Sequence, residues 1–330
     1  MPATMTALSG GSGPDWTPRQ VPVPEPRPGQ VVVRARAVAL NHADAVMLAA
    51  ADPTACGTGE EYRAGFEFAG EVTAVGEGAG APAVGSRVMG TAPGSFAQYV
   101  AADHRHVVRV PDVLGDEEAC ALPTGLLTEY GALAVAGFRA GQSVLITGAT
   151  SGIGLIGVRI ARALGAASVI ATTRDQARAG LLQDAGAHTV VVTGDGGQDM
   201  TRTVLAATGG QGVHVALDHV GGRTFAGCLP ATRTDGAVVS VGRLDRAAST
   251  VDLDALAHRH LRLYGVSFGF TRAAELGGVL AAAAEQLLPA VAEGRVRPLI
   301  DAAFSFDTAA EAAARLRGHQ GRGKIILRVP

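Results

Sequence analysis

Apolar and polar positions alternate in the N-terminal part of the chain, as they do in strands that bury one face. Val31 to Val38 alternates with arginines, and Glu67 to Val75, Gly85 to Gly90 and Phe96 to Val100 continue the pattern. Glycine and proline separate these runs at short intervals, as in small antiparallel barrels. The pattern up to Ala119 therefore predicts a β-rich domain.

From Ala119 onward the pattern changes to strands that alternate with helices. Ser143 to Thr147 is a short apolar strand, and Ile153 to Leu164 repeats apolar residues every four positions on one helical face. Further strands are predicted at Ser168 to Thr172, Thr189 to Val192, Val213 to Asp218 and Ala237 to Val241, with a helix over Gln176 to Asp184. This β-α-β-α-β order predicts an α/β fold with a Rossmann doubly wound parallel sheet.

The C-terminal part of the chain predicts a return to the β-rich domain, because two helical stretches after Gly269 lead to a last strand at Lys324 to Val329. At 330 residues the chain is long enough for two cores. We therefore expect one domain from residues 1–122 and 268–330, and a second from residues 123–267.

Composition and charge narrow the class of protein. The chain is 47% hydrophobic with a formal net charge of −2, so it has no electrostatic signature of nucleic-acid or anionic-membrane binding. Cys56, Cys120 and Cys228 are far apart, which argues against disulfides or a structural zinc site and fits a reducing cytosol. Met1 to Gly13 lacks the pattern of a signal peptide, and the apolar stretch Leu276 to Val291 is interrupted. These features predict a soluble cytoplasmic protein without a nucleic-acid or membrane partner.

The segment Thr147 to Gly154, here called the glycine loop, directly follows a predicted strand and begins a predicted helix. Glycines let the backbone turn tightly and approach a pyrophosphate, and the helix N-terminus supplies free N–H groups. A purely structural turn is the alternative, but a second strand follows at the right distance. We therefore expect Ser151, Gly152, Ile153 and Gly154 to bind a dinucleotide.

The residue that distinguishes NAD from NADP lies about 20 positions further on, at the end of the second strand. That position is Thr173, followed by Arg174, and Arg178 lies one helical turn later. Arginine binds phosphate in a bidentate manner, whereas NAD enzymes usually carry an acid here, so the pattern favours NADPH. Asp175 leaves the NAD alternative open, because a shift of one residue would bring it closer, and both arginines could instead be solvated.

Several motifs, taken in their order, resemble the medium-chain dehydrogenase/reductase superfamily, and within it the zinc-free quinone oxidoreductase-like branch. They are Asn41–Asp44, Gly65–Val72, Phe96–Val100, Ala119–Leu133, the glycine loop, Asp218–Gly222 and Gly323–Leu327, and they run nearly from end to end. The resemblance implies a GroES-like β-barrel domain, a Rossmann domain and a nicotinamide cofactor in the cleft between them. It also implies a homodimer formed through the Rossmann sheets.

Zinc-binding members of that superfamily hold the metal at three positions, which match Asn41, Phe66 and Thr124 here. Phenylalanine cannot bind a metal, and asparagine and threonine are poor Zn²⁺ ligands compared with thiolate or imidazole. We therefore expect no zinc, and no simple alcohol oxidation that depends on it.

The glycine loop also looks like the fingerprint of short-chain dehydrogenases, which need a Tyr-x-x-x-Lys pair. The only lysine of the chain is Lys324, and Gln320 stands four residues before it. That alternative therefore fails.

The resemblance places Asn41 and Thr128 near the nicotinamide, with Asp44 close by. Asn41 and Asp44 could instead form a hydrogen-bonded turn, and Thr128 could be only a helix cap. Val220 and Gly242 follow Rossmann strands whose carboxyl ends face the cofactor, so we expect both to line it.

This chain differs from the family at the residue that donates the proton. Relatives that reduce enoyl thioesters, and several quinone reductases, carry a tyrosine shortly after the aspartate, where this chain has Asp52. Tyr62 in the next loop is the candidate replacement, and otherwise the proton comes from solvent or His42. At the Rossmann edge, His219 is more often incidental than catalytic. Lys324 could reach the 2′-phosphate from the last strand, or carry a solvated charge.

Three functions follow from these features. The first is an NADPH-dependent, zinc-independent reductase that transfers hydride to a small-molecule quinone or α,β-unsaturated carbonyl. The second is an enoyl-thioester reductase of a polyketide or fatty-acid pathway, which the missing tyrosine puts in doubt. The third is a non-catalytic NADPH-binding sensor or partner protein, which turnover of NADPH would exclude.

Overall fold

The computed structural model describes residues 2–55, 57–80, 82–193, 198–267, 272–318 and 321–330, and the chain divides into two units. Unit 1 consists of Met1–Thr124, Gly269–Leu288 and Pro298–Pro330, and unit 2 of Gly125–Phe268 and Pro289–Arg297. The sequence predicts all of residues 268–330 in the first domain, whereas Pro289–Arg297 clusters with unit 2. The guanidinium of Arg159, in α5 (Gly152–Ala163), ties this segment to unit 2 by donating to the carbonyl oxygen of Arg297.

The strands of unit 1 form two sheets. The larger has seven strands in the order β15–β16–β3–β5–β6–β8, with β7 beside β3, and only its β15–β16 pair is parallel. Its strands are β3 (Gln30–Leu40), β5 (Glu67–Val75), β6 (Arg87–Thr91), β7 (Tyr99–Asp103), β8 (Val107–Arg109), β15 (Ile300–Ser305) and β16 (Lys324–Arg328). The smaller sheet has the order β2–β1–β4, from β1 (Thr4–Gly10), β2 (Thr17–Pro22) and β4 (Tyr62–Arg63).

The core of unit 1 follows from the alternation in its strands. In β3, Val33 and Ala35 are buried while Arg34 between them is exposed, as the sequence predicts. Trp16 and Phe96 pack edge to face in this core, with ring centroids 5.2 Å apart. Trp16 therefore contributes to the packing of this core.

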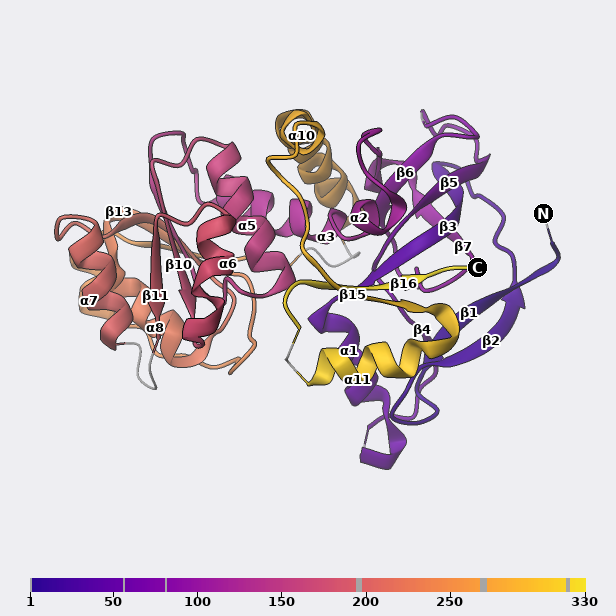
Figure 1. The fold of residues 1–330 in the computed structure, drawn as a ribbon, viewed down its shortest axis with the longest axis horizontal. Coiled ribbons are helices and arrows are strands. Elements are labelled where there is room, and N and C mark those ends of the chain that lie inside the picture. The colour runs from indigo at the N-terminus through magenta and orange to yellow at the C-terminus, as the bar shows by residue number, and fades with distance from the viewer. Residues whose placement is uncertain (1, 56, 81, 194–197, 268–271, 319–320) are drawn as a thin grey trace. The chain divides into compact units, whose positions relative to one another are not determined.

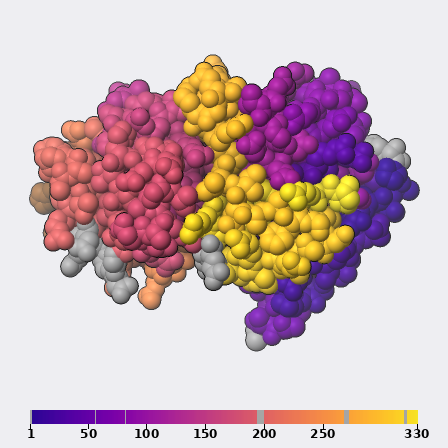
Figure 2. Space-filling model, in the orientation of Figure 1, coloured from indigo at the N-terminus to yellow at the C-terminus, as the bar shows by residue number. Residues whose placement is uncertain are grey.

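The chain ends in unit 1. β16 pairs antiparallel with β3, so that Ile325 lies opposite Leu40 and Leu327 opposite Val38. The yellow strand β16 runs beside the indigo β3 in Figure 1, and the yellow segment forms part of the surface of this unit in Figure 2. The last strand is thus an integral part of the sheet that the first hundred or so residues build.

Unit 2 is a six-stranded parallel sheet in the order β11–β10–β9–β12–β13–β14. Its strands are β9 (Ser143–Ile146), β10 (Ser168–Thr173), β11 (Thr189–Val192), β12 (Val213–Asp218), β13 (Thr232–Ser240) and β14 (Arg262–Gly265). Leu145, Ile170 and Val238 lie in one apolar cluster, while their strand neighbours Val144 and Val169 are equally buried. Both faces of the sheet are therefore covered, as a parallel sheet requires.

Helices cover the strands and connect them (Figure 1). In unit 2 they are α4 (Gly131–Val135), α5, α6 (Ala179–Asp184), α7 (Gln198–Ala207), α8 (Gly222–Ala231) and α9 (Leu253–His258), with a π-helical turn, η3, at Leu126–Tyr130 and a 3₁₀ turn, η4, at Gln176–Arg178. Elsewhere they are α1 (His42–Ala51), α2 (Asp116–Cys120), α3 (Pro123–Gly125), α10 (Ala273–Ala292) and α11 (Ala309–Arg317), with 3₁₀ turns η1 (Pro53–Ala55), η2 (His104–His106) and η6 (Phe306–Thr308). None of the helices in the described part of the chain is both long and apolar enough to cross a membrane.

A close backbone contact in unit 1 requires glycine at position 70, which a substitution can test. A Cβ atom at this position of β5 would lie 2.0 Å from the carbonyl oxygen of Arg34 on β3. We expect Gly70→Ala to lower the free energy of unfolding by about 1–3 kcal/mol or more, because neighbouring backbone must shift. Urea denaturation measures this change. Gly13→Ala is the control, since a Cβ there meets nothing within 4 Å, and equal losses in both variants would contradict the argument.

Candidate functional site

The segments predicted to bind a cofactor meet at one edge of the unit 2 sheet. β10, β9, β12 and β13 are parallel neighbours, so the residues that follow them lie side by side. These residues are Arg174 after β10, Thr147 after β9, His219 after β12 and Val241 after β13. Ligands of open parallel sheets bind at this carboxyl edge.

The glycine loop makes the tight turn that the sequence predicts. Gly148 has a φ of +57°, a conformation that residues with side chains rarely adopt, and a Cβ at Gly154 would lie 2.7 Å from the Cα of Ala149. The hydroxyl of Ser151 caps α5 by accepting the N–H of Gly154 at 3.0 Å. The N–H of Gly154 therefore already has an acceptor, the Ser151 hydroxyl. The N–H groups of Gly152 and Ile153, at the start of the helix, have no acceptor within the helix.

Arg174 and Asp175 both lie at the end of β10, where the sequence predicts the ribose of the cofactor. Thr173 is buried, and its hydroxyl accepts the N–H of Asp175 at 3.1 Å. The carboxylate of Asp175 accepts the N–H of Ala177 and lies 3.5 Å from Nε of Arg178. Arg174 and Asp175 are both exposed directly after the strand, and the carboxylate of Asp175 is hydrogen-bonded to the start of its own helix.

Val220 and Gly242 lie beside the glycine loop and the next strand end. A Cβ at Gly148 would come within 3.1 Å of Cγ2 of Val220, and a Cβ at Gly242 within 2.5 Å of the carbonyl oxygen of His219. Thr128 lies half-buried in the π-helical turn η3. The structure therefore brings Val220 and Gly242 to the same edge as the loop.

His219 makes more contacts than its place in the sequence predicts. Its ring is buried, and its two nitrogens lie 2.6 Å from Oε1 of Glu129 and 2.9 Å from the carbonyl oxygen of Thr147. Glu129 was not predicted as a site residue at all. The only signal that could have found it is a charged residue in an otherwise apolar helical stretch, Leu126 to Leu133.

In unit 1 a cluster of buried polar side chains forms around Glu67. The sequence predicts no role for Glu67 beyond its place in the motif Gly65–Val72. Glu67 accepts hydrogen bonds from the side-chain amide of Asn41 at 2.9 Å, from the ammonium of Lys324, and from the backbone N–H of Thr124 at 2.9 Å. The ammonium also donates to Oδ1 of Asn41 at 2.8 Å. All three side chains are at most 6% exposed.

This arrangement corrects the prediction that Lys324 binds the 2′-phosphate. Its side chain is 3% exposed and its ammonium is shared between Glu67 and Asn41. Separating a buried cation from its carboxylate partner is costly, so the group is not free to meet a phosphate.

Asp44 lies next to this cluster and is 2% exposed. Burial raises the pKa of Asp44 to about 7, although the N–H of Asn41, which donates to Oδ2 at 2.7 Å, and the charge of Lys324 both act to lower it. The carboxyl group is therefore poised to hold or release a proton near neutral pH. The same hydrogen bond fixes the start of α1, so Asp44 also serves the structural role that was the alternative.

Tyr62 approaches this region from β4. Burial raises its pKa, a hydrogen bond from Trp16 lowers it, and the charge of Asp44 raises it further. The indole N–H of Trp16 lies 3.4 Å from the phenol oxygen. Asp52, at the position of the family's tyrosine, is buried and accepts the N–H and the hydroxyl of Thr54.

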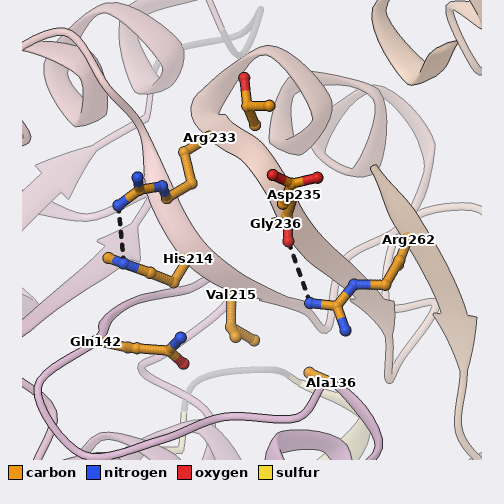
Figure 3. Close-up of a pocket in the computed structure, with 9 residues that line it drawn as sticks. Ala136, Gln142, His214, Val215, Arg233, Asp235, Gly236 and Arg262 are labelled. Carbon is orange, nitrogen blue, oxygen red and sulfur yellow. Dashed lines mark hydrogen bonds between the residues drawn. The ribbon is translucent and has the colours of Figure 1, made fainter. Parts of the chain in front are cut away.

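A separate cavity of about 260 Å³ lies at the opposite, amino edge of the unit 2 sheet (Figure 3). Arg233 and Arg262 line it, and Arg233 donates to the ring of His214 at 2.9 Å. None of the predicted cofactor residues lines this cavity, so it is distinct from the candidate site.

Comparison with known families supports the assignment of both units. The model described as the alcohol dehydrogenase GroES-like domain matches residues 27–112, and the one described as a zinc-binding dehydrogenase matches residues 152–285. The first match lies in unit 1 and the second mainly in unit 2.

Individual relatives fall into two groups. The chain is 32% identical over 312 residues to the mycocerosic acid synthase-like polyketide synthase of Mycobacterium tuberculosis, a match that covers 92% of this chain but only 14% of that protein. Mycobacterial Rv1454c, solved in complex with NADPH, is similar with a TM-score of 0.84 and 27% identity, covering 98% of this chain and 99% of that one. A mycobacterial quinone oxidoreductase gives a TM-score of 0.85 at 26% identity, with the same coverage.

The name of the second family model implies zinc, but the residues at the expected positions do not fit that metal. The amide of Asn41 is bonded to Glu67 and to an ammonium group, Phe66 has no ligating side-chain atom, and Thr124 offers a hydroxyl. In the described part of the chain no group of three His, Cys, Asp or Glu side chains could hold a metal ion.

The raised pKa of Asp44 predicts a pH-dependent stability. Because the folded-state pKa of about 7 lies above the ordinary aspartate value of 3.8, the native state retains a proton that the unfolded state loses, and the free energy of unfolding should fall as pH rises between these values. We expect this fall to be roughly 3–5 kcal/mol and to disappear in Asp44→Asn. Urea denaturation at pH 4 to 7 measures it. The exposed Asp112→Asn is the control, and an unchanged slope in Asp44→Asn would refute the assignment.

Proposed function

The chain belongs to the medium-chain dehydrogenase/reductase superfamily, in its quinone oxidoreductase-like part, and from this premise we propose its activity. We propose that it is an NADPH-dependent, zinc-independent reductase that transfers hydride to a quinone or an α,β-unsaturated carbonyl compound. When bound, NADPH supplies the hydride, and the protein orients it and stabilises charge on the acceptor.

The observation that carries the proposal is the geometry at the carboxyl edge of unit 2. The glycine loop presents the N–H groups of Gly152 and Ile153 at the start of a twelve-residue helix, where a pyrophosphate binds favourably. Arg174 is exposed after β10, and Asp175 is engaged by Arg178 and Ala177. This arrangement favours a 2′-phosphate over a free ribose hydroxyl. The similar protein Rv1454c, solved in complex with NADPH, supports the choice of this cofactor.

We assign roles to the unit 1 residues on chemical grounds. Asn41 accepts a hydrogen bond from the Lys324 ammonium, which is also paired with Glu67. Asp44 can hold a proton near pH 7 because its carboxyl group is buried. Tyr62 is half-buried with its hydroxyl near Trp16, and it is the candidate that passes a proton to the reduced substrate.

Enoyl-thioester reduction is the second candidate, and one observation favours it. The chain spans 14% of the length of a polyketide synthase that it matches over 92% of its own residues. A reductase that resembles a segment of a polyketide synthase fits enoyl-thioester reduction in such a pathway. Against it stands Asp52, which caps the end of α1 at the position of the family's tyrosine.

Assembly and location rest on the resemblance alone. We propose a cytoplasmic homodimer joined through the unit 2 sheets, in which β14 is an edge strand. A non-catalytic NADPH-binding protein remains the alternative of another class, and it differs by failing to oxidise NADPH with any acceptor.

Arg174 gives a direct test of cofactor choice. We expect Arg174→Ala to raise KM for NADPH by about 10- to 100-fold, because a hydrogen-bonded charge pair contributes 1.5–3 kcal/mol, and to leave KM for NADH nearly unchanged. Initial rates of nicotinamide oxidation measure both constants. Arg139→Ala, an exposed arginine before β9, is the control. Equal changes for both cofactors would show that Arg174 does not read the 2′-phosphate.

The substrate class is tested by oxidation of NADPH with a simple quinone, a simple enone and a crotonyl thioester. We expect turnover with the quinone or the enone, and the same rate after dialysis against a zinc chelator, because the donor set does not fit zinc. Turnover of the thioester alone would favour the second candidate. Loss of activity on chelation, restored by zinc, would exclude a zinc-independent reaction.

A further inference from the structure

A buried pair of side chains in unit 2 joins two segments that carry predicted cofactor contacts. His219 follows β12, and Glu129 lies 90 residues earlier in the π-helical turn η3. Nε2 of His219 and Oε1 of Glu129 are 2.6 Å apart, and the two side chains are 6% and 0% exposed. Neither residue was given a role in the reaction above.

The hydrogen bonds of the ring fix where its protons are. The carbonyl oxygen of Thr147, 2.9 Å from Nδ1, can only accept, so Nδ1 carries a proton. One further proton lies between Nε2 and the Glu129 carboxylate. Burial lowers the pKa of His219, but the charge and hydrogen bond of Glu129, with the charge of Asp218, raise it overall. The two side chains therefore share a proton along the Nε2–Oε1 contact.

The main chain of His219 extends the connection to the other cofactor segments. Its N–H donates to the hydroxyl of Thr147 at 3.1 Å, at the first residue of the glycine loop. Its carbonyl oxygen accepts the N–H of Leu244 at 3.2 Å. The same oxygen would lie 2.5 Å from a Cβ at Gly242, so the segment after β13 passes close to it. One residue thus contacts the glycine loop, the segment after β13 and, through its ring, η3.

Glu129 is placed by few other interactions. Its second oxygen, Oε2, is buried and has no hydrogen-bond partner among the residues that the structure describes. A Cβ at Gly157 of α5 would lie 2.3 Å from that oxygen, so the glycine leaves room for the carboxylate. Among the described contacts, the bond to His219 is therefore the one that orients this side chain.

We propose that His219 and Glu129 are positioning residues that set the π-helical turn, and with it Thr128, at a fixed distance from the glycine loop. This inference rests on the proposed function, in which the loop binds the pyrophosphate, and on the family resemblance, which implies that Thr128 lies near the nicotinamide. The pair then controls where the nicotinamide end of the cofactor lies, while its pyrophosphate is held by the helix start of α5.

The Kd for NADPH and the value of kcat, taken together, distinguish this positioning role from a merely structural one. Pyrophosphate binding depends on the loop, so Kd for NADPH should hardly change when the pair is broken. Hydride transfer depends on the placement of the ring, and a displacement of about 1 Å can lower the rate by about 100-fold. A loss of kcat with retained affinity is therefore the expected signature.

The experiment compares His219→Asn with His219→Gln. An asparagine amide reaches about as far as Nδ1 and can still donate to Thr147, whereas a glutamine amide reaches about as far as Nε2 and can still donate to Glu129. We expect His219→Asn to lower kcat by about 10- to 100-fold and to raise the primary isotope effect with deuterated NADPH. His219→Gln should recover most of the rate. His188→Asn, a histidine whose ring bonds the N–H of Val169 in the same unit, is the control.

The double variant Glu129→Gln/His219→Asn guards against a folding defect, because it leaves no unpaired buried charge. It should fold and still show the low kcat. Wild-type kcat in His219→Asn, or equal losses in His219→Asn and His219→Gln, would overturn the inference alone. A wild-type protein that neither binds nor oxidises NADPH would overturn the proposed function, and this inference with it.

Discussion

A charge that is buried away from water must meet an opposite charge and further hydrogen bonds, and this constraint organises both units of the protein. In unit 1 the carboxylate of Glu67 is satisfied by Lys324, Asn41 and the N–H of Thr124. In unit 2 one oxygen of the Glu129 carboxylate, Oε1, is paired with His219. Each cluster joins chain segments that are far apart in sequence, so that the elements around it have little freedom to move independently.

The second organising feature is the parallel sheet of unit 2. Because its strands run in one direction, the loops that follow β9, β10, β12 and β13 all emerge at one edge. That is why the sequence could predict which residues gather there without knowing their contacts: apolar runs located the strand ends, and the glycine loop identified the phosphate-binding turn. The alternation of Val33, Arg34 and Ala35 located β3 of unit 1 in the same way.

Residues whose partners are distant in sequence could not be assigned from the pattern. Lys324 and Asn41 are 283 residues apart, and nothing local in β16 indicates that the lysine points into the core rather than to solvent. His219 and Glu129 are 90 residues apart, and each alone is an unremarkable polar residue. The helix α1 was missed for a different reason, since the short motif at Asn41–Asp44 suggested a turn while the alanine-rich residues after it favour a helix.

The buried ammonium also has a consequence for chemical labelling. Lys324 is the only lysine of the chain, so its side chain is the only ε-amino group that an acylating reagent can find. It is 3% exposed, and its Nζ is held between Glu67 and Asn41, so a reagent does not reach it in the folded protein. Acylation of this residue therefore reports the moments when β16 separates from β3. Acylation mapped to this one residue would therefore follow the local opening of unit 1.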